Sequence, residues 1–262
     1  MSDAPVVADY PAPEPAATAW KALFLPHSGG SAASYRTLAH HLAGAARTAG
    51  VEYPGRGRRS AAPLFTDLHA LADEVAEAVA AWREDAPLLL FGHSLGAAVA
   101  YEVVRRTPAR HRTVLVVSGH PAPSHLSLSE LLRTGSEDPV PDPAQDPVVA
   151  LVARLGGDGA ALLAHPTLRH LFLPVIRSDL TAHSRYRPER GARVDCPVLA
   201  LTGDADPLTD EAGTRAWARH TTAGFRHHSF AGGHFFPTEH AGEVAAVLRE
   251  TMAGAPAGTA VI

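Results

Sequence analysis

The most informative short pattern in the chain is Gly92–Gly96, Gly-His-Ser-Leu-Gly, in which two glycines flank a serine at alternate positions. A serine on a sharp turn from a strand into a helix has a strained backbone, and its neighbours must lack bulk for the turn to close. The apolar run Leu88–Phe91 before the pattern and a helix expected over Leu95–Arg106 supply this context. Ser94 is therefore a candidate nucleophile. The alternative is a tight turn whose serine only caps the helix.

A serine hydroxyl becomes a good nucleophile only when a base takes its proton, so a histidine is required. The chain has 16 histidines. His234 is the best placed, because it follows the last expected strand and precedes the last helix, where a loop can carry it over the strand ends. The histidine pairs at 40–41 and 227–228 lack carboxylates at metal-ligand spacing, so we expect no metal site and no cofactor.

The third group should be a carboxylate that orients the imidazole and stabilises its cation. Asp204 and Asp206 both follow a buried strand expected over Pro197–Thr202. We favour Asp206, because Asp204 directly follows a turn glycine and is better placed to brace the loop. The resulting chain order, Ser94 then Asp206 then His234, is that of the α/β-hydrolase fold.

An oxyanion hole needs two N–H donors, one of them from the residue after the nucleophile, here Leu95. The second donor should come from the loop after the first core strand, Pro26–Gly30. We expect it to be the backbone N–H of Ser28, since the glycines at 29 and 30 would let the backbone approach a substrate closely. An ordinary glycine turn is the alternative.

Strand-sized apolar runs alternate with helical patterns along most of the chain, which is typical of an α/β protein. Runs such as Thr113–Ser118 are continuously apolar, which favours a mostly parallel sheet covered by helices on both faces. Residues 119–195 contain no convincing strand. We expect a helical lid there, with its best helices over Val148–Arg154 and Leu168–Tyr186, inserted into a single α/β-hydrolase domain over residues 18–252.

The composition indicates a globular protein without nucleic-acid or membrane partners. Of 262 residues, 46% are apolar and 19% charged. The net charge is −4, so the chain lacks the excess of basic residues that is typical of nucleic-acid-binding proteins. No apolar run is long enough to cross a membrane, and the first 15 residues resemble no secretory signal. We therefore expect a cytoplasmic protein. The ends, over 1–17 and 253–262, are predicted to be flexible tails.

Several longer segments occur in a fixed order along residues 20–250. They are Pro26–Gly30 (P-x-x-G-G), Tyr53–Arg59 (P-G-R-G-x-R), Gly92–Ala97 (G-H-S-[ML]-G-A), Cys196–Pro207 (a strand and G-D-x-D-P) and Gly232–Phe236 (G-G-H-F-F). Together they resemble type II thioesterases, the stand-alone hydrolases that accompany modular polyketide synthases and nonribosomal peptide synthetases. The acidic, Pro-rich stretch Glu137–Pro147 departs from this family by its length.

The resemblance implies hydrolysis of acyl or aminoacyl thioesters from the 4′-phosphopantetheine arm of carrier proteins, which removes stalled or mis-primed groups. It places the family's nucleophile on Ser94, its acid on Asp206 and its base on His234. It also implies that acyl or peptidyl carrier proteins bind transiently, in trans, to a monomeric enzyme. A small-molecule carboxylesterase or lipase on the same fold is the alternative, because a triad does not fix the substrate. A non-catalytic binding protein would have a broken triad.

The P-G-R-G-x-R segment also forms a local basic cluster of Arg56, Arg58 and Arg59 in an acidic chain. Guanidinium groups bind phosphate and carboxylate groups through paired hydrogen bonds. The cluster could therefore meet a phosphate or an acidic protein partner. A solvated loop is the alternative interpretation.

Overall fold

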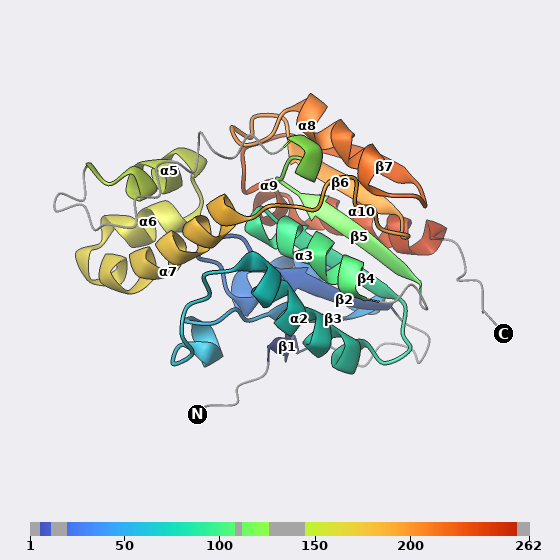
Figure 1. Cartoon of the computed structure of the whole chain (residues 1–262), viewed down its shortest axis with the longest axis horizontal. Helices are drawn as coiled ribbons and strands as arrows, with labels where there is room; N and C mark the ends of the chain where they lie inside the picture. The colour runs from blue at the N-terminus through green and yellow to red at the C-terminus, as the bar shows by residue number, and fades with distance from the viewer. Residues whose placement is uncertain (1–5, 12–19, 108–111, 126–144, 256–262) are drawn as a thin grey trace.

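In the computed structural model of the chain, seven strands form one sheet in the order β1-β3-β2-β4-β5-β6-β7 (Figure 1). The structure describes residues 6–11, 20–107, 112–125 and 145–255. All neighbouring strands run parallel except β1, which is antiparallel to β3. This mostly parallel sheet confirms the predicted fold class. The strands are β1 (Val7–Asp9), β2 (Trp20–Leu25), β3 (Ala46–Val51), β4 (Leu88–His93), β5 (Thr113–Ser118), β6 (Val198–Gly203) and β7 (Phe225–Phe230).

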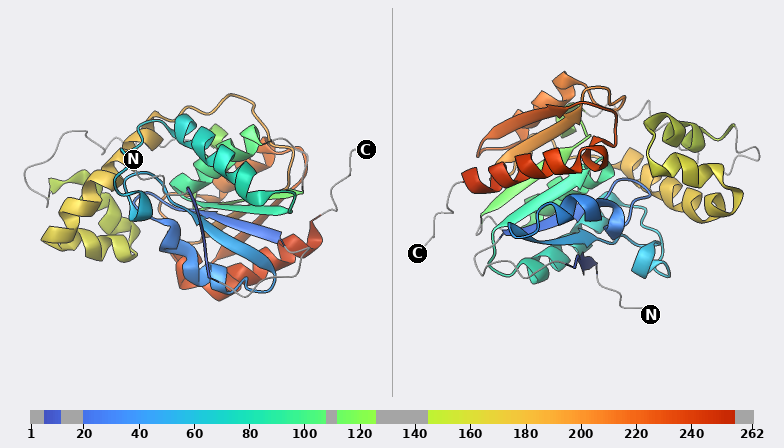
Figure 2. Two further views of the ribbon diagram at one scale, coloured as in Figure 1. Left: turned by 90° about the horizontal axis from the view of Figure 1, so that it is seen from below. Right: turned by 180° about the vertical axis from the view of Figure 1, so that it is seen from behind.

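Helices cover both faces of the sheet (Figure 2). On one face lie α2 (Leu68–Arg83) and α3 (Leu95–Arg106), and on the other lie α1 (Arg36–His40) and α10 (Ala241–Gly254). Successive residues of a strand point to opposite faces, so the sheet needs apolar residues at every position when both faces are covered. This is why the central strands are continuously apolar. The described ranges also contain the short helices η1 (Ala32–Tyr35), η2 (Gly57–Arg59), η3 (Pro123–His125), α8 (Glu211–Arg215), η5 (Ala216–His220) and α9 (Phe236–Glu239).

Three further helices form a separate unit at one end of the molecule (Figure 1). We call α5 (Pro147–Leu155), α6 (Asp158–Ala164) and α7 (Pro166–Arg185) the α5–α7 unit. They share a small apolar core of their own. The helices predicted over Val148–Arg154 and Leu168–Tyr186 correspond to α5 and α7, whereas α6 was missed because seven residues after two glycines carry little periodicity. Most of the Pro-rich stretch predicted at 137–147 lies outside the described residues.

The N-terminal strand β1 is a correction to the sequence prediction of a flexible tail over residues 1–17. Its residues pair with the edge strand β3, and the following Tyr10 is 8% exposed. The Tyr10 hydroxyl donates a hydrogen bond to the Ala32 carbonyl. Three residues between prolines are too few to show an alternating pattern, so the pairing with β3 could not be predicted locally. At the other end, α10 continues to Gly254, into the tail predicted over 253–262.

Tyr10 provides a test of whether this N-terminal segment is part of the folded core. Tyr10→Ala should lower the free energy of unfolding by about 3 kcal/mol, because a buried ring and its hydrogen bond are lost. Urea denaturation followed by circular dichroism measures this change. Pro11→Ala, at the exposed neighbouring residue, should change the free energy by less than about 0.5 kcal/mol. Wild-type stability in Tyr10→Ala would contradict the assignment.

Candidate active site

The three candidate catalytic residues follow strands that end at one edge of the sheet. Ser94 follows β4, Asp206 lies in the loop after β6, and His234 lies in the loop after β7. Because these strands are parallel, their C-terminal ends meet at the same edge, where α/β proteins place their ligands. The predicted loops therefore converge although their residues are far apart in the chain.

Ser94 occupies a strained turn between β4 and α3. Its φ of 55° and ψ of −123° place it in a region that residues with a side chain rarely adopt. A Cβ at Gly92 would lie 2.1 Å from the Gly96 carbonyl oxygen, and one at Gly96 would lie 2.2 Å from the Leu25 carbonyl oxygen. Both flanking glycines are thus required for the turn to close. The Ser94 side chain makes no capping hydrogen bond to α3, so the capping alternative does not describe this turn.

His234 and Asp206 form a buried hydrogen-bonded pair. His234 Nδ1 lies 2.9 Å from Asp206 Oδ2, and the two side chains are 1% and 0% exposed. Nδ1–H donates to the carboxylate, which leaves Nε2 of a neutral ring as a proton acceptor. The Leu208 N–H donates to the other carboxylate oxygen of Asp206 at 2.9 Å. Asp204 instead accepts a hydrogen bond from the Gly232 N–H at 2.9 Å, the bracing position expected for it.

Two other histidines lie close to this pair and are neutral. The His93 ring lies 4.7 Å from the His234 ring, and His27 contacts His93 with a centroid distance of 6.0 Å. Burial lowers the pKa of His93 well below its ordinary value and lowers the pKa of His27 to about 3, and the nearby His234 acts in the same direction. Neither ring therefore carries a charge at neutral pH.

A further histidine pair links the sheet edge to α7. The Nε2 atoms of His120, which follows β5, and His183, in α7, lie 2.9 Å apart. His120 Nδ1–H donates to the Pro121 carbonyl at 2.7 Å, so its Nε2 accepts the proton of His183 Nε2. Burial lowers the pKa of His120 to about 4 and that of His183 well below its ordinary value. The pair is therefore neutral, and it was not predicted from the sequence.

The loop expected to supply an oxyanion donor is a tight turn. The Gly30 N–H donates to the His27 carbonyl at 2.9 Å, and Gly29 has a φ of 78°. Within the described part of the chain, no hydrogen-bond acceptor is found for the Ser28 N–H. Leu95 is the first residue of α3, so its N–H has no acceptor within the helix. The partial positive charge at the N-terminus of the helix makes this N–H a stronger donor to an anion.

The structure corrects the interpretation of Arg56 as part of a basic cluster open to phosphate. Arg56 is only 6% exposed and makes a two-pronged ion pair with Asp179 of α7, which is fully buried. Arg59 pairs with Glu74, and only Arg58 is exposed. Sequence reasoning missed Asp179. The signal available was an acidic residue between Ile176 and Leu180, on the apolar face of a predicted helix.

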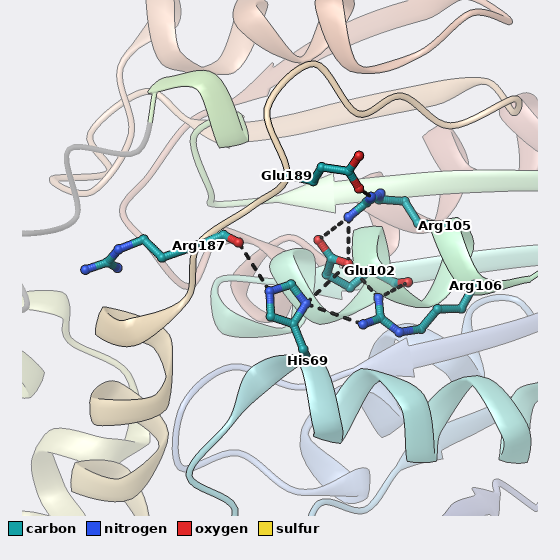
Figure 3. A pocket seen from close by; sticks show the side chains of 6 residues that line it. All are labelled: His69, Glu102, Arg105, Arg106, Arg187 and Glu189. Atoms are coloured by element: carbon teal, nitrogen blue, oxygen red, sulfur yellow. Dashed lines mark hydrogen bonds and ion pairs between the residues drawn. The ribbon is translucent and has the colours of Figure 1, made fainter.

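A polar pocket outside this site is lined by His69, Glu102, Arg105, Arg106, Arg187 and Glu189 (Figure 3). Arg105 and Arg106 pair with Glu102, and Arg105 also pairs with Glu189, whereas the Arg187 guanidinium donates to the Ser184 and Tyr186 carbonyls. Glu102 is fully buried and accepts hydrogen bonds from Arg105 at 3.0 Å and from Arg106 at 2.6 Å. The Tyr186 hydroxyl donates to the same carboxylate at 2.7 Å. The side-chain contacts around the pocket therefore join α2 and α3 to the segment after α7.

Two kinds of site are absent from the described ranges, 6–11, 20–107, 112–125 and 145–255. They contain no group of histidine, cysteine or acidic side chains arranged to hold a metal ion. No helix within them is long and apolar enough to cross a membrane.

Comparisons with known proteins place this chain among thioesterases. The thioesterase domain family matches residues 22–252. The chain is 35% identical to thioesterase PikA5 of Streptomyces venezuelae over 247 residues, 90% of this chain and 84% of that protein. The type II thioesterase BorB from the borrelidin biosynthetic cluster aligns with a TM-score of 0.73 and 35% identity, over 93% of this chain and 94% of BorB. YbtT, a type II thioesterase from the yersiniabactin NRPS/PKS pathway, aligns with a TM-score of 0.77 and 29% identity, over 94% and 97%.

The buried neutral histidines should make stability depend on pH. The pKa of His120 is about 4 when folded and about 6.5 when unfolded. Between these values the unfolded chain binds a proton that the folded chain does not. The stabilisation is complete above about pH 6.5 and falls as pH decreases toward 4, by up to about 1.4 kcal/mol per pH unit.

Urea denaturation at about pH 7 and about pH 5.5 measures this effect. His120→Asn should show a smaller loss of free energy of unfolding than the wild type between the two pH values. His40→Asn is the control, because the His40 ring is exposed to solvent in the folded chain as well as in the unfolded chain. This variant should lose as much free energy of unfolding as the wild type. Equal losses in wild type and His120→Asn would contradict a neutral buried His120.

Proposed function

The chain belongs to the thioesterase domain family, and we propose that it hydrolyses acyl or aminoacyl thioesters from the phosphopantetheine arm of carrier proteins. In this role it removes stalled or mis-primed groups in polyketide or nonribosomal peptide biosynthesis. The observation that carries the proposal is the buried hydrogen bond from His234 to Asp206, 2.9 Å long, at the sheet edge that also holds the strained Ser94 turn. The likeness to BorB and YbtT supports the substrate class.

The first half of the reaction forms an acyl-enzyme. Ser94 Oγ attacks the thioester carbonyl carbon while His234 Nε2 accepts the hydroxyl proton, and Asp206 stabilises the resulting imidazolium. The carbonyl oxygen becomes an oxyanion that accepts hydrogen bonds from the N–H groups of Ser28 and Leu95. The C–S bond then breaks, and His234 returns the proton to the departing thiolate.

The second half releases the acid. His234 Nε2 takes a proton from water, which attacks the acyl-enzyme carbonyl, and the second oxyanion uses the same donors. Collapse breaks the bond to Ser94 Oγ, which recovers its proton from His234. Because a thiolate leaves easily, the reaction depends more on substrate positioning and oxyanion stabilisation than on assistance to the leaving group.

The proposed partners follow from this chemistry. An acyl or peptidyl carrier protein docks transiently, in trans, and delivers the thioester without a cofactor bound to the enzyme itself. The α5–α7 unit acts as the lid over the substrate, within a single catalytic domain over residues 18–252. The enzyme works in the cytoplasm as a monomer.

A substitution of the nucleophile tests the proposal. Ser94→Ala should lower kcat on acyl-N-acetylcysteamine and acyl-carrier-protein thioesters by at least about 10³-fold, because covalent catalysis is lost. Ser60→Ala makes the same change in an exposed loop and should retain wild-type rates. Liquid chromatography with mass spectrometry of the released acid measures the rates. Undiminished hydrolysis by Ser94→Ala would exclude Ser94 as the nucleophile.

The esterase alternative is tested with the same protein. The wild type should have a higher kcat/KM on carrier-bound thioesters than on p-nitrophenyl esters of the same acyl groups. A strong preference for the oxoesters would favour a small-molecule carboxylesterase and contradict the proposed substrate class.

A further inference from the structure

Helix α7 buries an ion pair directly against the loop that carries Ser28. Asp179 Oδ2 accepts a hydrogen bond from the Gly29 N–H at 2.8 Å. The guanidinium of Arg56 donates to Asp179 at 2.7 Å and 2.6 Å, and also to the Gly30 carbonyl at 3.1 Å. The loop is thus held on both sides, through an N–H by Asp179 and through a carbonyl by Arg56.

This loop needs an external constraint. Two successive glycines give its backbone more freedom than any other residue pair would, and Gly29 adopts a positive φ of 78°. The peptide between Ser28 and Gly29 is the central peptide of the turn, and rotation of this peptide interconverts turn types. Asp179 accepts the N–H of this same peptide. The carboxylate therefore fixes the orientation of the peptide directly after Ser28, and with it the type of turn that the Ser28 backbone enters.

The ion pair is itself rigid. Asp179 is fully buried, and buried charges persist only where they are paired and hydrogen-bonded. Arg56 also lies over two aromatic rings, at 5.4 Å from the Tyr53 ring centre and 6.0 Å from that of Phe65. Because its guanidinium is packed and bonded on several sides, the pair forms a fixed support rather than a mobile surface contact.

We propose that Asp179 and Arg56 are positioning residues that hold the Ser28 N–H in place for the oxyanion, so that the oxyanion hole is complete only when α7 is seated on the loop. The inference rests on the proposed function, in which Ser94 is the nucleophile and Ser28 an oxyanion donor. It extends that function, because α7, a helix of the α5–α7 unit, then supports the catalytic site.

A purely structural role is the competing explanation, and the chain contains a matched pair that separates the two. Asp146 is 2% exposed, pairs with Arg177 of α7 at 2.5 Å, and accepts a hydrogen bond from the Val148 N–H at 2.9 Å. This pair joins α5 to α7 within the same unit. Asp146→Asn therefore removes a buried carboxylate with the same two kinds of partner as Asp179→Asn does.

The experiment compares kcat, KM and melting temperature for the wild type, Asp179→Asn and Asp146→Asn on acetyl-N-acetylcysteamine and p-nitrophenyl acetate. Asp179→Asn should lower kcat by about 10²-fold on both substrates, the size of effect seen when an oxyanion donor is lost, with KM within about threefold of the wild type. Asp146→Asn should lower the melting temperature but keep kcat within about threefold. The proposal is overturned if Asp179→Asn retains kcat, or if both variants lose kcat equally.

A second pair of variants keeps the test decisive if Asp179→Asn does not fold. Arg56→Lys keeps the charge but loses the fork that reaches Asp179 and Gly30 together, and it should lower kcat about tenfold. Arg177→Lys is its control and should keep the wild-type kcat. If Arg56→Lys also keeps it, the positioning role is wrong.

The two substrates separate this inference from the proposed function. Both reactions pass through an oxyanion, so the ratio of variant to wild-type kcat on p-nitrophenyl acetate tests the positioning role on its own. If the wild type hydrolyses the oxoester but not the thioester, the proposed substrate class fails. A loss of about 10²-fold in Asp179→Asn on the oxoester would then still support the role of Asp179.

Discussion

The positive φ of Ser94 is the constraint on which the rest of the site depends. A serine with a φ of 55° between a buried strand and a helix projects its hydroxyl from the sheet edge. This turn closes only because Gly92 and Gly96 have no Cβ, so that the backbone segments on either side can approach closely. The parallel sheet supplies the rigid surroundings that keep this strain in place. The neighbouring strand ends then bring Asp206 and His234 to the same edge, where burial makes their hydrogen bond strong.

Helix α7 and the residue that follows it are attached to this edge and to α3 through three side chains. Asp179 contacts the Ser28 loop through Gly29, His183 contacts His120 after β5, and Tyr186, directly after the helix, contacts Glu102 of α3. Their spacing of four and three residues places them on one side of a helix. Each contact is a buried or partly buried polar interaction, which fixes geometry more strictly than apolar packing does. The position of α7 and the geometry of the Ser28 loop are therefore linked.

The sequence was sufficient wherever structure is determined locally. Helix α3 begins and ends at Leu95 and Arg106 as predicted, and β5 spans Thr113–Ser118 as predicted, because each has a strong pattern and clear limits. The loops carrying the candidate triad were found because each follows a recognisable strand. The pairing of Arg56 with Asp179 could not be found in this way, since the two are 123 residues apart and burial of an arginine is a property of the assembled fold. Likewise β1 exists only because β3 offers an edge with which to pair.

The claim that Ser94 carries the acyl group is tested most directly by trapping the intermediate. The enzyme is mixed with an acyl-N-acetylcysteamine thioester, quenched in acid within its first turnovers, digested with trypsin and examined by mass spectrometry. If Ser94 is the nucleophile, the peptide Glu84–Arg105 gains the mass of the acyl group, and fragment ions place that mass on Ser94. An acyl group on any other residue, formed at the rate of hydrolysis, would contradict it.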